Sequence, residues 1–376
     1  MKKQIQHISF SILIFIGLCS CASSNFEDIN NVVLNICEKK VPISNIAHLA
    51  HCVQLKDCGN NSIITGTDRV ICWEGNIYVF DDANDIITCN DMSGKMLAST
   101  QKYKGHGNNE YIHLSDMSFD ETTGQIYALC DTPSEIIIFD KNLQIKSVQT
   151  IEERPIEMCV DSTHIMLLCR NLKKDNYEVL CLKKGHLDEN PEVILSSKIV
   201  VNKIMGIGRN LTYSDGECWV SFPFNNCVYK ISNGKIDETY CIDFKNRWYK
   251  NNNYNTTQFL KENSNNVWSI QNIQKCGQFL WFNSNTEELY CLDTSNNQCY
   301  CYNNIIYDTI PYASQLIVPQ QGLKNTISFC VMPEFIFPYL KNVEKHHLEE
   351  QEGQTYSLAK SNLLEKNAMI TFWEIK

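Results

Sequence analysis

The segment Gly105–Tyr111, with sequence Gly-His-Gly-Asn-Asn-Glu-Tyr, combines residue types that could contact a ligand with types that shape a loop. His106 and Glu110 could form a ligand rim, because an imidazole and a carboxylate both hydrogen-bond polar ligands. Alternatively, the two glycines allow backbone conformations closed to other residues, and Glu110 accepts bonds from amides of its own loop. We favour this second interpretation, a structural corner built from Gly105, Gly107, Glu110 and Tyr111.

Three aromatic residues form a second candidate ligand surface. Trp248, Tyr249 and Tyr254 lie in an insertion, residues 244–266, that is rich in Asn and poor in apolar residues. We expect this insertion to be an exposed loop, and exposed aromatic rings beside amides suit stacking on sugars or peptides. The same rings could instead pack the loop onto the sheet beside it. The sequence leaves both interpretations open.

Local motifs for catalysis and for metal binding are absent from the sequence. It contains neither His-x-x-x-His nor His-Glu-x-x-His, the spacings that place two zinc ligands on one helical face. It also lacks the Gly-x-Ser-x-Gly turn of α/β-hydrolases. We therefore expect no metal, no cofactor and no locally encoded catalytic residue. Catalytic groups collected from distant parts of the chain would leave no such local pattern.

The N-terminus carries a targeting signal. Lys2 and Lys3 precede an apolar stretch, residues 8–18, that is too short to span a bilayer comfortably. The following Leu-Cys-Ser-Cys resembles a bacterial lipobox with Cys21 as the lipidated residue; a plain secretory signal is the alternative. We expect an outer-membrane lipoprotein of the cell envelope, on the periplasmic face or the cell surface. The expected parts are a signal peptide (1–20), a lipidated cysteine with its tether (21–30) and one folded domain (31–376).

The charge balance excludes nucleic acid as a partner. The chain has 43 acidic against 33 basic residues, a net charge of −10. Removal of Lys2 and Lys3 with the signal peptide would bring the mature chain to about −12. A negative surface repels phosphate backbones.

The 19 cysteines are unusual for an exported protein. If Cys19 is removed and Cys21 is acylated, seventeen remain, and an odd number cannot pair completely. Many lie inside apolar runs, where a thiol acts as a small hydrophobic side chain. We expect mainly structural thiols rather than a disulfide framework.

The fold is indicated by a repeated strand–turn–strand unit. Short runs rich in β-branched and aromatic residues, such as 75–81, 125–130 and 135–140, alternate with turns of Asn, Asp, Pro or Ser. Antiparallel hairpins at this spacing are typical of a β-propeller. The final run, 368–375, alternates like a strand, and we expect it to complete the first blade, which closes the ring and removes an exposed edge.

The Gly105–Tyr111 segment resembles the Gly-Arg-Gly-Pro-Gly-Glu-Tyr signature of a family of six-bladed β-propeller lipoproteins from Bacteroidota, similar to NHL and TolB-type propellers. This sequence has His106 where Arg is usual and Asn108-Asn109 where Pro-Gly is usual. The segments 53–55, 77–81, 117–120 and 367–370 match the family in the same order. The resemblance implies an all-β fold of six four-stranded antiparallel blades, closed by the C-terminal strand, and brings no reaction with it.

Three functions agree with these observations. The one we favour is a lipid-anchored envelope propeller that binds or scaffolds a glycan, a peptide or an envelope protein. A propeller enzyme, a hydrolase or lyase with its active site in the central funnel, is the second. A structural subunit of an envelope complex is the third. Clustered carboxylates and histidines in the channel would favour the enzyme, and an aromatic, uncharged rim would favour binding.

Overall fold

The fold was analysed in a computed structural model of the chain. The structure describes residues 29–37, 41–56, 64, 66–107, 109–187, 189–200, 208–250, 255–286, 288–302, 305–306, 308, 318–323, 325–346, 356–357, 359–360 and 367–376.

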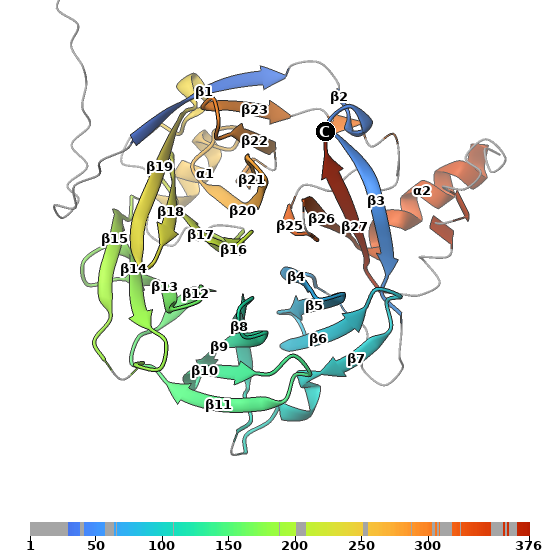
Figure 1. The fold of residues 1–376 in the computed structure, drawn as a ribbon. Helices are drawn as coiled ribbons and strands as arrows, with labels where there is room; N and C mark the ends of the chain where they lie inside the picture. The colour runs from blue at the N-terminus through green and yellow to red at the C-terminus, as the bar shows by residue number, and fades with distance from the viewer. Residues whose placement is uncertain are drawn as a thin grey trace, which may run out of the picture.

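Six four-stranded antiparallel sheets stand around a central axis as the blades of a propeller (Figure 1). Each blade runs from an inner strand at the axis to an outer strand at the rim, as the sequence predicted. Blade 1 contains β4 (Arg69–Trp73), β5 (Asn76–Asp81), β6 (Ile86–Asp91) and β7 (Met96–Ser99); blade 2 contains β8 (His113–Asp120), β9 (Gln125–Thr132), β10 (Ser134–Phe139) and β11 (Ile145–Thr150); blade 3 contains β12 (Pro155–Val160), β13 (His164–Asn171), β14 (Asn176–Lys183) and β15 (Glu192–Lys198).

The other three blades follow the same plan, and the last one combines both ends of the chain. Blade 4 contains β16 (Leu211–Ser214), β17 (Glu217–Ser221), β18 (Cys227–Ser232) and β19 (Lys235–Asp243); blade 5 contains β20 (Ile270–Cys276), β21 (Phe279–Ser284), β22 (Leu289–Asp293) and β23 (Gln298–Tyr302); blade 6 contains β25 (Gln320–Gln321), β26 (Thr326–Val331), β27 (Met369–Ile375) and, as its outer strand, β3 (Ala47–Gln54).

Tight turns set the register of the hairpins. The two-residue loops Glu74-Gly75, Asp215-Gly216 and Asn233-Gly234 have positive φ at both positions, between 45° and 79°. Two consecutive positive φ values define the type I′ turn, whose twist matches that of the flanking strands. The Asp and Asn residues expected at turns therefore have a direct structural role.

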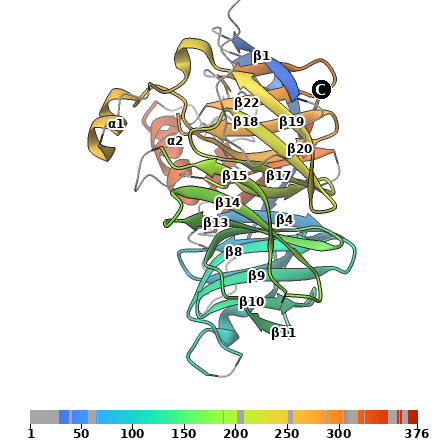
Figure 2. The same ribbon diagram turned by 90° about the vertical axis from the view of Figure 1, so that its left-hand side faces the viewer.

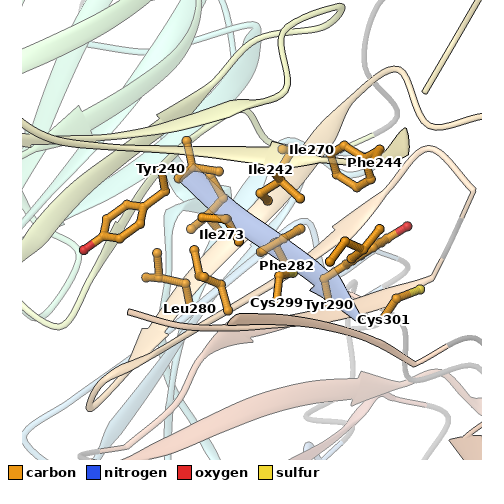
Figure 3. Close-up of a cluster of buried hydrophobic side chains, with 14 of the residues drawn as sticks. Tyr240, Ile242, Phe244, Ile270, Ile273, Leu280, Phe282, Tyr290, Cys299 and Cys301 are labelled. Carbon is orange, nitrogen blue, oxygen red and sulfur yellow. The ribbon is translucent and has the colours of Figure 1, made fainter. Parts of the chain in front are cut away.

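The hydrophobic core is divided into layers between neighbouring blades. Figure 3 shows the layer between blades 4 and 5, where Ile242, Leu280 and Phe282 meet. The rings of Phe282 and Tyr290 stack here with centroids 5.1 Å apart. Because alternate residues of a strand point to opposite faces, each blade contributes to two layers.

Most of the described cysteines belong to these layers, as expected for structural thiols. Thirteen are free, and eleven of these are buried. One disulfide joins Cys227 to Cys241, which lie opposite each other on β18 and β19. Among the described residues, thiols therefore fill space more often than they cross-link.

The two ends of the chain close the ring. The C-terminal strand β27 pairs antiparallel with β26 on one side and with the N-terminal strand β3 on the other. The predicted closing role of this strand is confirmed. It completes blade 6 rather than blade 1, because the chain begins with the outer strand of blade 6 before it forms β4.

An additional N-terminal strand, β1 (Ile29–Cys37), lies on the perimeter of the ring (Figure 1). It runs parallel to β19 of blade 4 and to β23 of blade 5 and pairs with both. These two blades thereby become one nine-stranded sheet. A two-stranded parallel sheet of β2 (Val41–Pro42) and β24 (Ile305–Ile306) follows along the rim.

The helices lie outside the blades. Helix α1 (Thr256–Glu262) falls in the insertion expected to be a loop, and α2 (Pro333–His346) connects β26 to β27. Both project from one side of the ring in Figure 2. Short 3₁₀ turns occur at Ile43–Asn45, Thr100–Tyr103 and Lys245–Arg247. In the part of the chain that is described, no helix has both the length and the apolar composition needed to cross a bilayer.

Candidate functional site

Four charged side chains from three blades and one connection meet in the central channel. Asp116 on β8 is fully buried, and its Oδ1 lies 3.3 Å from Nε of Arg69 and 2.9 Å from a terminal nitrogen of Arg209. Glu157 on β12 is also buried and is oriented toward blade 4. The carboxylate of Asp116 pairs with both guanidinium groups, which limits the energetic cost of burying these charges.

These carboxylates satisfy backbone groups that the propeller architecture leaves unpaired. The inner strand of a blade has one free edge, and each buried N–H on that edge needs an acceptor. Asp116 Oδ2 accepts the N–H of Met158 on the next blade at 2.7 Å. Glu157 Oε2 accepts the N–H groups of Asn210 and Leu211, one blade further on, at 2.7 and 2.6 Å.

The same arrangement recurs elsewhere around the axis. Oε1 of Gln320 in blade 6 accepts the N–H of Val70 in blade 1 at 3.2 Å. Oδ1 of Asn272 in blade 5 accepts the N–H of Arg209 at 2.9 Å. Polar side chains of the inner strands therefore bond one blade to the next.

The arginines are held by carbonyl groups as well as by charge. Arg69 donates to the carbonyl oxygens of Met158 and Leu211, at 3.3 and 3.0 Å, and so spans blades 1, 3 and 4. Arg209 donates to the carbonyl of Ser115 at 3.3 Å. Burial lowers the pKa of Arg69, while Asp116 raises it. The cluster therefore fills the channel at this level and bonds blades on opposite sides of the axis.

The space that the described residues leave in the channel is small. The cavity bordered by Arg69, Arg209, Tyr213 and Gln274 encloses about 10 Å³, room for about one water molecule. Oε1 of Gln274 is buried there without a hydrogen-bond partner among the described residues. The channel at this level therefore suits a bound water and is too narrow for a sugar or a peptide.

One pair of carboxylates lies at the mouth of the channel. Burial, followed by a hydrogen bond with Asp82, raises the pKa of Asp68 to about 6, while Arg209 opposes the shift. The Asp68 carboxyl can therefore carry a proton near pH 6. Among the described residues, no cluster of three or more His, Cys, Asp or Glu side chains is arranged to hold a metal ion.

The Gly105–Tyr111 segment forms the connection between blades 1 and 2. Glu110 accepts the N–H of Gly107 at 2.7 Å, the role expected in a structural corner. Tyr111 is fully buried, and its hydroxyl lies 2.7 Å from Oγ1 of Thr100. An added Cβ at Gly105 would come within 2.1 Å of the Glu110 carboxylate, so a larger residue there would displace Glu110 from its bond to Gly107. Neither Gly105 nor Gly107 has a positive φ. His106 is exposed to solvent.

The aromatic residues of the insertion are half-buried. The ring of Trp248 stacks on Phe244 with centroids 5.3 Å apart, and Tyr249 packs edge-on against Phe224 at 5.4 Å. Contacts with Phe244 and Phe224 thus cover much of the surface of Trp248 and Tyr249, and the rest of that surface faces solvent. Two other predicted residues, Tyr254 and Cys21, lie outside the described residues.

The predicted rim residues share one face of the ring but lie far apart on it. We define the connection face as the face that carries the links between outer and inner strands, residues 100–112 and 244–269 among them. His106 and Glu110 lie between blades 1 and 2, whereas Trp248 and Tyr249 lie between blades 4 and 5, across the ring. The structure does not bring these two groups into one site.

The channel residues Arg69, Asp116, Glu157 and Arg209 were not predicted. Each lies within an inner strand or just before one, in runs such as Arg-Val-Ile and Glu-Met-Cys. A charged residue inside a buried run, repeated in successive blades, is a pattern from which the channel residues could have been predicted. Recognising it requires knowledge of which strands are innermost.

Glu157 should make stability depend on pH in the direction opposite to an ordinary ion pair. Burial raises its pKa to about 7, against the effect of Arg209. The folded chain then binds more protons than the unfolded chain between about pH 4.5 and 7, so stability falls as pH rises through this window. The Glu157→Gln variant keeps an acceptor but does not titrate. We expect urea denaturation to show a pH slope flatter by about 1 kcal/mol per unit; an equal slope would contradict the shift.

Comparisons with known proteins agree with this architecture. A family model described as a six-bladed beta-propeller, DUF5128, matches residues 22–310. A candidate exported protein of Bacteroides fragilis has 14% sequence identity and a TM-score of 0.66, with 93% of this chain and 99% of that chain covered. A member of the DUF4221 family from Bacteroides vulgatus has 8% identity and a TM-score of 0.57, with 88% and 98% covered. At these identities the two structures share the fold alone. No curated protein matches the chain significantly.

Proposed function

Because the chain belongs to the DUF5128 family of six-bladed β-propellers, we propose that it is an exported, lipid-anchored envelope protein that binds a glycan, peptide or protein partner on its connection face. The observation that supports a binding role is that the charged side chains of the channel are engaged in structural contacts. The oxygens of Asp116 accept a backbone N–H group and the arginines, and an oxygen of Glu157 accepts two backbone N–H groups. The groups that would do acid–base chemistry in a funnel thus hold the blades together.

The sequence of the first twenty-one residues supports export. The similarity in fold to the candidate exported protein of Bacteroides fragilis agrees with it. Acylation of Cys21 would supply several lipid tails, and the combined burial of those tails gives stable membrane attachment. The outer membrane is the destination we propose.

The anchor can be tested by fractionation. Replacing Cys21 with Ala removes the acyl acceptor, so we expect the protein to move from the membrane fraction to the soluble envelope fraction. Cys52→Ala, in the folded domain, is the matched control and should leave the protein in the membrane fraction. A Cys21→Ala protein that still sediments with membranes would rule out this anchor.

The binding face can be tested by chemical cross-linking in intact cells. Exposed lysines distinguish the two faces: Lys173 and Lys245 lie on the connection face, and Lys183 and Lys235 lie on the opposite face. An amine-reactive cross-linker followed by peptide mass spectrometry should place partner cross-links on the first pair. Cross-links confined to the second pair would refute the proposed face, and a glycan array on the purified Cys21→Ala protein covers carbohydrate partners.

The carboxylates at the mouth of the channel favour one second candidate, a propeller enzyme. Asp68 has a pKa of about 6, raised first by burial and then by a hydrogen bond with Asp82, so Asp68 could exchange a proton with a small ligand. Asp68→Asn should abolish such an activity while leaving cross-linking to a partner unchanged. Loss of partner binding in the same variant would place the binding site at the mouth instead.

A further inference from the structure

Two cysteine sulfurs meet inside the hydrophobic layer between blades 3 and 4. Cys159 lies on β12, the inner strand of blade 3, and Cys218 lies on β17, the second strand of blade 4. Both residues are fully buried, and their Sγ atoms are 2.6 Å apart. The two positions are 59 residues apart in sequence, so only the folded ring brings these thiols together.

The distance between the two sulfurs is shorter than a contact between separate thiols. Unbonded carbon atoms attract each other best at about 3.5–4.0 Å, and sulfur is not a smaller atom. A disulfide bond is about 2.05 Å long. At 2.6 Å, the pair therefore lies nearer to bond length than to contact distance. A closer approach of about 0.5 Å would reach the length of a bond.

The strands that carry the two cysteines hold the sulfurs in this position. β12 pairs with β13, and β17 pairs with both β16 and β18, so hydrogen bonds fix each backbone. The Cys159 thiol donates to the carbonyl oxygen of Thr212 at 3.4 Å and is thereby directed across the layer toward blade 4. Both cysteines belong to the same buried cluster, together with Leu168 and Val220. The two thiols thus face each other from rigid supports.

We propose that Cys159 and Cys218 form a disulfide bond that joins blade 3 to blade 4 covalently. This inference goes beyond the proposed function, and it requires an oxidant that itself carries a disulfide. The thiolate of one cysteine attacks that disulfide, and the thiolate of the other then attacks the mixed disulfide and releases the oxidant. The two cysteines lose two protons and two electrons, and the oxidant becomes two thiols.

The bond has to form before the layer closes. Burial raises the pKa of the Cys218 thiol well above its usual value, and the thiolate is the form that attacks a disulfide. In the closed layer, neither Cys159 nor Cys218 is exposed to solvent. Oxidation therefore takes place while blades 3 and 4 assemble, and the finished layer then protects the bond from reductants. The bond between Cys227 and Cys241 differs, because both of its cysteines are partly exposed.

Oxidative refolding tests the bond directly. The Cys21→Ala protein would be unfolded and reduced in urea, then refolded in a buffer of glutathione and glutathione disulfide. After the remaining thiols are alkylated in denaturant, peptide mass spectrometry should find Cys159 linked to Cys218, with the bond between β18 and β19 as the internal control. If both cysteines are alkylated in a chain that regains its circular dichroism spectrum, the proposal is overturned. A link from either one to Cys181, in the same layer, would also overturn it.

Thermal melting gives a second measurement, on protein that is secreted into the periplasm of an expression host and purified without reductant. In the Cys227→Ala/Cys241→Ala background, dithiothreitol should lower the melting temperature by about 5 °C, because the bond closes a long loop. Adding Cys218→Ala should abolish this dependence on reductant. The matched control, Cys181→Ala, removes another thiol from the same layer and should retain it. Equal melting temperatures with and without reductant in the starting background would refute the bond.

Discussion

Replacement of Asp116 by alanine is expected to destabilise the protein by about 3–5 kcal/mol, the range for breaking a buried ion pair. The substitution leaves Arg69 and Arg209 buried without their shared carboxylate. It also removes the acceptor for the N–H groups of Met117 and Met158, each 2.7 Å from an oxygen of Asp116. Loss of this size is a large part of the total stability of a typical domain. Urea denaturation of the purified chain measures it.

Asp140→Ala is the matched control for this substitution. Asp140 also accepts two backbone N–H groups, from Asn142 and Gln144, but it lies in a solvent-accessible turn. Water can replace those bonds, so the expected cost is about 1 kcal/mol. If the two variants lose similar stability, the channel cluster does not hold the blades together.

Deletion of residues 367–376 is expected to prevent the ring from closing. The deletion removes β27, whose Met369, Ile370, Phe372 and Trp373 are almost completely buried. Each such side chain contributes about 1.5–3 kcal/mol, so their sum approaches the stability of a whole domain. Both β26 and β3 would also lose their ladder partner. We expect loss of the cooperative thermal transition in circular dichroism.

Removal of Lys376 alone provides the comparison for this deletion. That residue donates its backbone N–H to Ile46 at 3.0 Å and lies after the end of β27. Its loss should shift the melting temperature only slightly, because the strand and its buried side chains remain. A ten-residue deletion that still melts like the intact chain would show that β27 is not needed for closure.

The local pattern of the sequence predicted the features of the fold that depend on neighbouring residues. The hairpins at 75–81 and 125–140 were visible because alternation and turn residues are short-range signals. The strand at 368–375 was visible for the same reason. Helix α1 was missed because its buried surface is essentially the single side chain of Phe259, which gives no helical period.

The channel cluster was missed because its members meet only in the folded ring. Arg69 and Asp116 are far apart in sequence, and each looks like an ordinary charged residue near the beginning of a strand. The Gly105–Tyr111 corner was predicted more accurately, since Glu110 contacts an amide only three residues away. Short-range hydrogen bonds can be inferred from spacing, whereas bonds between blades cannot.

Because the chain is made from its N-terminus, β1 and β3 are formed long before the strands with which they pair. β1 pairs with strands that end at Asp243 and Tyr302, and β3 pairs with a strand that ends at Ile375. A chain secreted from its N-terminus must therefore cross as far as Asp243 before β1 finds its first partner, and almost entirely before β3 finds one. Such distant pairings form slowly. In the lipid-anchored protein that we propose, the segment after Cys21 would stay unpaired during secretion and so would remain accessible to the enzymes that cut and acylate such a chain.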